Sequence, residues 1–338
     1  MNPVTYPANK QSHATGMPEA GAFGRCRETS WLVLTLAVVT YTAGSILLNW
    51  MMYQAKTEGV IRQALVDLYR TTGGLVQPTL LNGLFLFSVT GLVIFGVGRL
   101  RPSDVGLRAS AIGPAVLVTL AFWIAMQGAL MVVIAFSDYS LVWHGAWREP
   151  RVVAGMYLAQ LLGTGLQEEV LFRGLLLPQF FLKARRRWQW AVALVFAVLG
   201  SGVVFALFHI PNRVFMHGVS GQDLSHNLLW TFWPGLAFAA LFLVTRNLFV
   251  CVGIHALRNE LAPLVQIWGR GWSDVWWALV VLILVAWPLA RRLTSPRARP
   301  CEESTTNYVL AEPNAAPNGG PAASGDKSIA PGGPPSVS

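Results

Sequence analysis

Short groups of polar residues interrupt the long apolar stretches of this chain at three places. They run from Glu168 to Arg173, from Phe205 to His209 and from His255 to Asn259. An ionisable side chain inside a membrane helix costs about 2.5–3.5 kcal/mol on insertion scales, so each needs a partner, a water-filled cavity or a function. Together they supply what hydrolysis in a membrane requires. A carboxylate can take a proton from water, a histidine can hold the water or pass the proton on, and an amide can donate to an oxyanion.

The first group predicts two different roles for its adjacent glutamates. Glu169 and Arg173 are four residues apart, so on a helix they share one face and can form a charge-assisted pair. Glu168 projects about 100° away from that face. We therefore expect Glu169 and Arg173 to be a structural pair and Glu168 to be free to act on water. The alternative is that all three form one buried ion network.

The other two groups also place polar side chains at helical spacing. Phe205 and His209 share one helix face, as do His255 and Asn259, which could point into one cavity. Taken alone, a histidine at a helix end is commonly interfacial, and a His–Asn pair can simply hold two helices together. The combination on three separate helices favours convergence on one site.

These residues lie in a chain that is too apolar for a water-soluble globular domain. Of its 338 residues, 54% are hydrophobic and 12% are charged, and the mean hydropathy is +0.48. Runs of roughly 20 apolar residues, enough to cross a bilayer, recur about eight times. Continuous apolar runs favour helices over barrel strands, so we expect an all-α polytopic membrane protein. The predicted spans are Trp31–Tyr53, Leu75–Gly98, Ala111–Phe136, Val152–Phe181, Trp190–His209, Leu228–Val244, Leu248–Trp268 and Trp272–Ala290.

The regions outside the spans predict tails and an orientation. Residues 1–28 and 293–338 are polar or rich in Pro, Gly, Ala and Ser, so we expect two disordered tails around a transmembrane domain at 29–292. Placing both termini on one side gives that side most of the Lys and Arg, which predicts cytoplasmic termini. A short helix from Val60 to Tyr69 is expected on the opposite side, either lying in the membrane interface or as an ordinary surface helix. The formal charge of +9 then indicates contact with anionic lipid, and nucleic acid is not an expected partner.

Two further residue types, glutamine and cysteine, are not expected to take part in the chemistry. Gln127, Gln160 and Gln167 lie in apolar spans, where interhelical hydrogen bonds are expected. The three cysteines are scattered, with no spacing that indicates a disulfide framework or a thiolate metal site.

The ordered motifs E-E-x-x-x-R, F-x-x-x-H and H-x-x-x-N resemble those of the CAAX protease and bacteriocin-processing (CPBP/Abi) family of intramembrane proteases. That family includes the Ras-converting CAAX prenyl endopeptidases. The resemblance covers about residues 99 to 268. It implies that Glu168 activates water with His209, and that His255 and Asn259 stabilise the oxyanion. Support would come from Glu169, Arg173 and Phe205.

The resemblance leaves the cofactor open, because the family has also been treated as metal-dependent. Glu168, His209 and His255 could then supply the open three-ligand set of a divalent metal such as zinc. A glutamate mechanism without a tightly bound metal is favoured.

The leading functional hypothesis is an intramembrane endopeptidase that cleaves a membrane-attached protein or peptide. A non-catalytic immunity or scaffold protein with the same fold is one alternative, and a proton- or metal-coupled transporter is another. Because arginine outnumbers lysine, the expected location is a bacterial plasma membrane.

One expectation conflicts with the convergence of His209 and His255 on one site. His209 falls near the non-cytoplasmic end of its predicted span, whereas His255 lies roughly 11 Å from the cytoplasmic end of its own. Straight, full-width helices cannot bring these residues together. The conflict predicts one of two departures. Either the basic segment from Lys183 to Trp188 lies deeper or extends as a helix outside the bilayer, or the fourth span breaks near Gly163 and Gly165.

Overall fold

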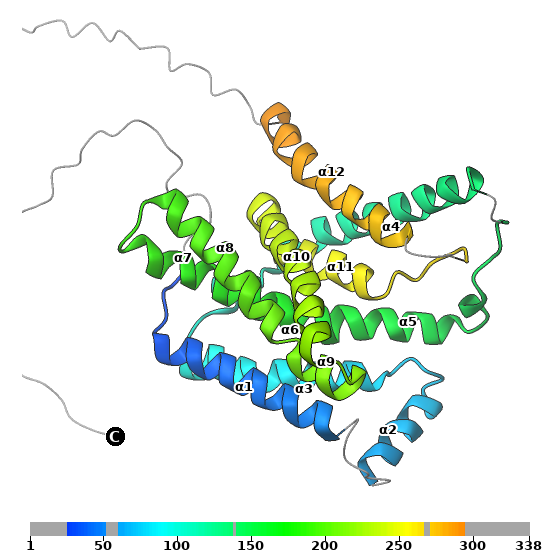
Figure 1. Ribbon diagram of the computed structural model, residues 1–338, viewed down its shortest axis with the longest axis horizontal. Helices are drawn as coiled ribbons and strands as arrows, with labels where there is room; N and C mark the ends of the chain where they lie inside the picture. The colour runs from blue at the N-terminus through cyan, green and yellow to red at the C-terminus, as the bar shows by residue number, and fades with distance from the viewer. Residues whose placement is uncertain (1–25, 52–59, 138–139, 267–270, 295–338) are drawn as a thin grey trace, which may run out of the picture. The chain divides into compact units, whose positions relative to one another are not determined.

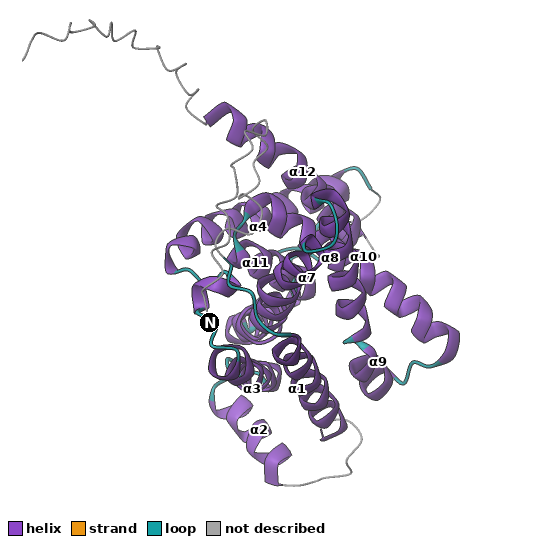
Figure 2. Cartoon of the chain, turned by 90° about the vertical axis from the view of Figure 1, so that its left-hand side faces the viewer, coloured by secondary structure: helices purple, strands orange, loops and turns teal. Residues whose placement is uncertain are grey.

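The computed structural model describes residues 26–51, 60–137, 140–266 and 271–294. Within these ranges the chain forms helices and connecting loops, as Figure 2 shows, and its only β pairing is an isolated bridge between Trp143 and Val265. The all-α prediction is therefore confirmed. Almost all of the predicted tails, 1–28 and 293–338, lies outside the described residues.

The α-helices are arranged along the chain as labelled in Figure 1. Their bounds are α1 Trp31–Asn49, α2 Val60–Thr71, α3 Pro78–Gly91, α4 Ile112–Ala135, α5 Pro150–Leu158, α6 Leu166–Glu169, α7 Leu177–Arg185, α8 Trp190–Leu207, α9 Ile210–His217, α10 Gly221–Thr245, α11 Leu248–Asn259 and α12 Gly271–Thr294. Helix α2 matches the short helix expected between the first two spans.

Among the described residues, six helical segments are long and apolar enough to cross a membrane. They are Trp31–Asn49, Pro78–Val97, Pro102–Ala135, Trp190–His217, Gly221–Thr245 and Trp272–Arg292. Each corresponds to a predicted span, and their number confirms a polytopic membrane protein. The two predicted spans not among them, the fourth and the seventh, carry the polar groups at Glu168 and His255.

The fourth span is one helix from Pro150 to Arg185 rather than a broken one. Two π-helical stretches, Ala159–Gly165 and Val170–Leu176, separate α5, α6 and α7. The expected break near Gly163 and Gly165 is therefore wrong: the helix widens there without ending. Wide turns of this kind are rare and are frequent at functional sites. Here they lie on both sides of α6, which carries the two glutamates.

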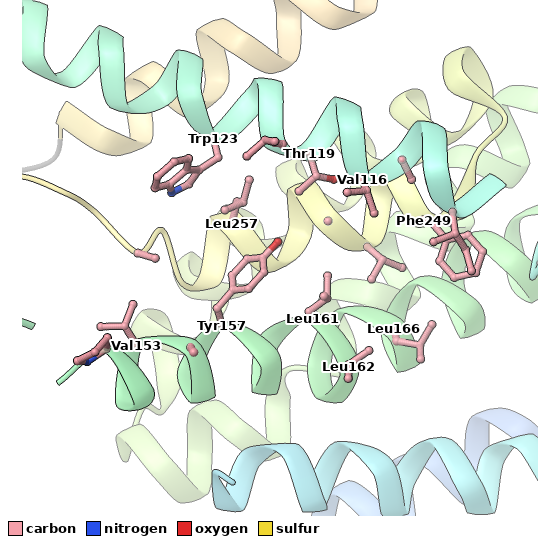
Figure 3. Close-up of a pocket in the computed structure, with 18 of the residues that line it drawn as sticks. Val116, Thr119, Trp123, Val153, Tyr157, Leu161, Leu162, Leu166, Phe249 and Leu257 are labelled. Carbon is pink, nitrogen blue, oxygen red and sulfur yellow. The ribbon is translucent and has the colours of Figure 1, made fainter. Parts of the chain in front are cut away.

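The seventh span is much shorter than predicted. Helix α11 has 12 residues and ends at Asn259, so the predicted end at Trp268 is wrong. At 1.5 Å per residue its length is about 18 Å, which is too short to cross the bilayer. Almost every residue from Leu248 to Leu257 is buried. Helix α11 lies between α4 and the helix formed by α5 and α6 (Figures 1 and 3).

The chain leaves α11 in an extended conformation because other groups satisfy its backbone. Pro263 lacks an amide hydrogen and disfavours a helical residue before it. The Leu264 amide donates to Gln127 Oε1 (2.9 Å), and the Leu264 carbonyl accepts from the His144 amide (2.9 Å). The predicted conflict with His209 assumed full-width helices, whereas α11 is short, ends four residues after His255 and brings its Nε2 to 3.7 Å from Glu168.

A set of polar contacts gathers the basic residues at one end of the bundle. The fully buried Gln179 of α7 accepts from the Thr29 amide (2.9 Å) and donates to the Arg27 carbonyl (2.8 Å). Glu28 pairs with Lys183 (3.1 Å) and Arg186 (2.7 Å). These bonds hold the segment before α1 against the end of α7, as expected if both lie on one side of the membrane.

Close backbone packing fixes α3 against the central helix. A Cβ built on Gly83 would overlap the Gly163 Cα, so only glycine allows this approach. We expect Gly83→Ala to destabilise the protein by about 1–3 kcal/mol, because the overlap is with backbone that cannot move aside. Gly96→Ala in the same span is the matched control, since nothing lies within 4 Å of its Cβ position. Thermal unfolding in detergent measures both, and equal midpoints would contradict the prediction.

Candidate active site

Glu169 is completely buried and is held by two charged or polar partners. Its Oε1 lies 3.1 Å from Arg173 Nη1 and 2.7 Å from His255 Nδ1. The expected pair with Arg173 is present. The contact with His255 was not expected, because only the packing of α11 against α6 brings the two residues together.

Arg173 is also fully buried, and its guanidinium has a second polar contact and aromatic neighbours. Its Nη2 donates to the Gly235 carbonyl in α10 (3.0 Å). The guanidinium carbon lies 4.5 Å from the centre of the Phe205 ring and 5.2 Å from that of Phe238. Cation–π contacts of this kind are strongest where water is excluded. Phe205 therefore supports the site by packing on the arginine.

His255 lies between the two glutamates. Because a carboxylate only accepts hydrogen bonds, the 2.7 Å contact places a proton on the Nδ1 that faces Glu169. Its Nε2 then faces Glu168 Oε2 at 3.7 Å. The ring stacks on Phe238, with centroids 4.6 Å apart and planes 19° apart. The orientation of this imidazole is thus fixed on two sides.

His209 lies between α8 and α9, as the N-cap residue of α9, and its ring is oriented by the backbone of α8. Its Nδ1 lies 2.8 Å from the Phe205 carbonyl, so Nδ1 donates and Nε2 is left available. The ring packs against Phe205, with centroids 4.8 Å apart. His209 therefore contacts the same phenylalanine that lies on Arg173.

Asn259 is the last residue of α11 and lines the same cavity as Glu168. Its amide Nδ2 donates to Gln160 Oε1 (3.1 Å), which confirms the interhelical bond expected for Gln160. Gln127 instead accepts from the Leu264 amide in the non-helical segment after α11, so its bond joins a helix to a loop rather than to a second helix. Gln167 differs, because its Oε1 is buried without a hydrogen-bond partner.

A cavity of about 420 Å³ brings most of these residues together. Glu168, His209 and Asn259 line it, and His255 lies just behind Glu168. Polar groups from other helices complete the wall, including residues that the sequence reasoning missed: Asn49, Thr79, Asn82 and Arg213. The only signal for them was a polar side chain at the edge of an apolar span. A cavity of this size and polarity can hold water and part of a ligand.

A larger cavity of about 610 Å³ lies elsewhere, between α4, α5 and α11. Figure 3 shows its apolar wall, with Trp123, Tyr157 and Leu257 on one part and Phe249 on another. The described lining contains no carboxylate and no histidine. The groups capable of acid–base chemistry therefore belong to the smaller cavity.

The donors of the smaller cavity are not arranged as a metal site. Among the described residues, no group of three or more His, Cys, Asp or Glu side chains could hold a metal ion. The Nδ1 atoms of His209 and His255 bond to the Phe205 carbonyl and to Glu169, which leaves both Nε2 atoms free, an arrangement that metal-binding histidines also use. Glu168, His209 and His255 are nevertheless not grouped as a three-ligand set in the described structure, and the mechanism without a tightly bound metal stays a prediction.

Comparison with known proteins identifies the segment that carries the site. Residues 150–261 match the family model described as type II CAAX prenyl endopeptidase Rce1-like. The match contains all three motifs and confirms the resemblance to the CAAX protease and bacteriocin-processing family. It points to a CAAX-type intramembrane protease. No curated protein and no solved structure matches the chain.

The buried pair of Glu169 and Arg173 predicts that the stability of the protein depends strongly on both residues. Arg173→Met should destabilise the protein by about 3–5 kcal/mol, because it leaves Glu169 buried without its counter-charge. Adding Glu169→Gln should recover at least about 1 kcal/mol, since the two sites are coupled. Unfolding in denaturant measures each variant.

The control for this cycle is an exposed arginine–glutamate pair in the same protein. The Arg186 side chain is 70% exposed and lies 2.7 Å from Glu28. Arg186→Met should cost less than about 1 kcal/mol. Equal losses for Arg173→Met and Arg186→Met, or strict additivity in the double variant, would show that burial does not set the energy of the network.

Proposed function

We propose that this chain, which shares its motif-bearing segment with the type II CAAX prenyl endopeptidases, hydrolyses a peptide bond in a membrane-attached protein or peptide. One observation carries the proposal. Glu168 lines a polar cavity, its Oε2 has no hydrogen-bond partner, and that oxygen lies 3.7 Å from His255. A carboxylate in this position can accept a proton from water in the cavity, whereas Glu169, which also has one unpaired oxygen, is completely buried and does not line the cavity.

In this mechanism Glu168 and His209 position and deprotonate the attacking water. The Nε2 of His209 accepts a hydrogen bond from the water, and Glu168 takes its proton. The hydroxide attacks the scissile carbonyl carbon, whose C=O electron pair moves onto the oxygen. The C–N bond then breaks, and Glu168 returns the proton to the leaving amine.

Asn259 and His255 are proposed to stabilise the oxyanion of the tetrahedral intermediate. The Asn259 amide group can donate directly from the cavity wall. His255 can donate from Nε2 when both ring nitrogens carry a proton, with its Nδ1 bonded to the Glu169 carboxylate. Arg173 and Phe205 act on the reaction only by holding Glu169 and the two histidines in place.

Replacing the proposed base tests the mechanism most directly. Glu168→Gln should lower cleavage by about 10²–10⁴-fold, the usual contribution of a general base, without changing the unfolding temperature. Glu260→Gln is the matched control, because Glu260 follows α11 but does not line the cavity. Quantifying C-terminal fragments in membrane proteomes of the two strains gives the measurement. Fragments that persist at wild-type abundance in the Glu168→Gln strain would favour a scaffold protein.

Metal removal separates this mechanism from zinc-dependent hydrolysis. Because the three donors are not arranged around a common point, we expect dialysis against EDTA or 1,10-phenanthroline to leave the cleavage rate within about twofold of the untreated enzyme. The rate is measured on purified protein in vesicles. Loss of activity that zinc alone restores would instead assign Glu168 and the histidines as ligands.

A further inference from the structure

Arg213 is a cation in the wall of the candidate active site. It belongs to α9 and lines the same cavity as Glu168 and His209. Its backbone amide donates to the His209 carbonyl (2.9 Å), so the two residues are one helical turn apart. It is the only arginine or lysine in the described lining of this cavity.

The Arg213 guanidinium has no carboxylate partner. Its side chain is partly buried, and its Nε is buried without a hydrogen bond. In the described ranges no ion pair within 4.0 Å involves it, although Glu168 lines the same cavity. Leaving a charged group partly desolvated and unpaired is unfavourable, and the cost disappears when an anion binds.

Two other arginines with a buried guanidinium nitrogen that lacks a hydrogen bond have contacts that Arg213 does not have. Arg173 is paired with Glu169 and with the Gly235 carbonyl. Arg258 lies over Trp276, with its guanidinium carbon 4.6 Å from the ring centre. Among the described residues, only Arg213 combines a place in the cavity wall with a guanidinium that has no ion pair and no hydrogen bond, which indicates that its partner is a ligand.

We propose that Arg213 binds the free C-terminal carboxylate of the substrate, a role that rests on the proposed function. A guanidinium pairs with a carboxylate through two parallel hydrogen bonds, and a carboxylate is the anion that every peptide end carries. A cavity of about 420 Å³ takes a ligand of a few residues, which favours the end of a chain over its middle. Arg213 then sets how many residues lie beyond the bond at Glu168, so the product is a short C-terminal peptide.

Binding to an inactive protein tests this without requiring cleavage. The Glu168→Gln protein in phosphatidylcholine nanodiscs is titrated with a fluorescent, N-palmitoylated alanine–leucine hexapeptide carrying a free C-terminal carboxylate. The same peptide with a C-terminal amide is the comparison. We expect the free acid to bind about tenfold more tightly, the low end for a charge-assisted bond. Adding Arg213→Gln should reduce this ratio to about one, Arg213→Lys should keep part of it, and the control Arg258→Gln should keep all of it.

Three results would overturn the proposal. Equal binding of acid and amide, including no binding of either, would show that the chain end is not recognised. An equal effect of Arg213→Gln on both peptides would fit an arginine that holds a lipid phosphate. Tight binding of an amidated peptide that ends in glutamate would assign the anion to a side chain. Full activity of Glu168→Gln, by contrast, would remove the proposed function and leave a measured preference at Arg213 standing.

Discussion

The buried carboxylate of Glu169 joins three helices that build the site. It accepts from Arg173 on its own helix and from His255 on α11, and Arg173 also reaches the Gly235 carbonyl of α10. A carboxylate without solvent must keep both partners, because losing either leaves an uncompensated charge in a medium of low dielectric constant. The positions of α6, α10 and α11 are therefore coupled through one side chain.

This coupling explains how adjacent glutamates acquire different chemistry. Glu169 faces helices that neutralise it, whereas Glu168 turns about 100° away into the polar cavity. The same carboxyl group is thus a fixed structural charge at one position and an available base at the next. His255 contacts both glutamates, so the orientation of its imidazole ring beside Glu168 depends on the pairing of Glu169.

Residue types and spacing were enough to predict the all-α membrane fold, the Glu169–Arg173 pair and the gathering of Glu168, His209 and Asn259. The length of α11 was not predictable, because Leu261, Leu264 and Val265 continue its apolar pattern. What ends the helix is Pro263 together with hydrogen bonds to Gln127 of α4 and to His144 in the segment before α5. Arg213 was overlooked for a related reason: it follows an apolar span, and only packing shows that it lines the cavity.

The two π-helical stretches on either side of α6 have a consequence for comparing relatives. A π turn bonds residue i to i+5 and so takes in one more residue than an α turn. Deleting that residue would rotate one part of the helix by about 100° against the other. A homologue without the extra residue would present a different side chain to the cavity. An alignment made without single-residue gaps would therefore match Glu168 and Glu169 to the wrong positions of that homologue.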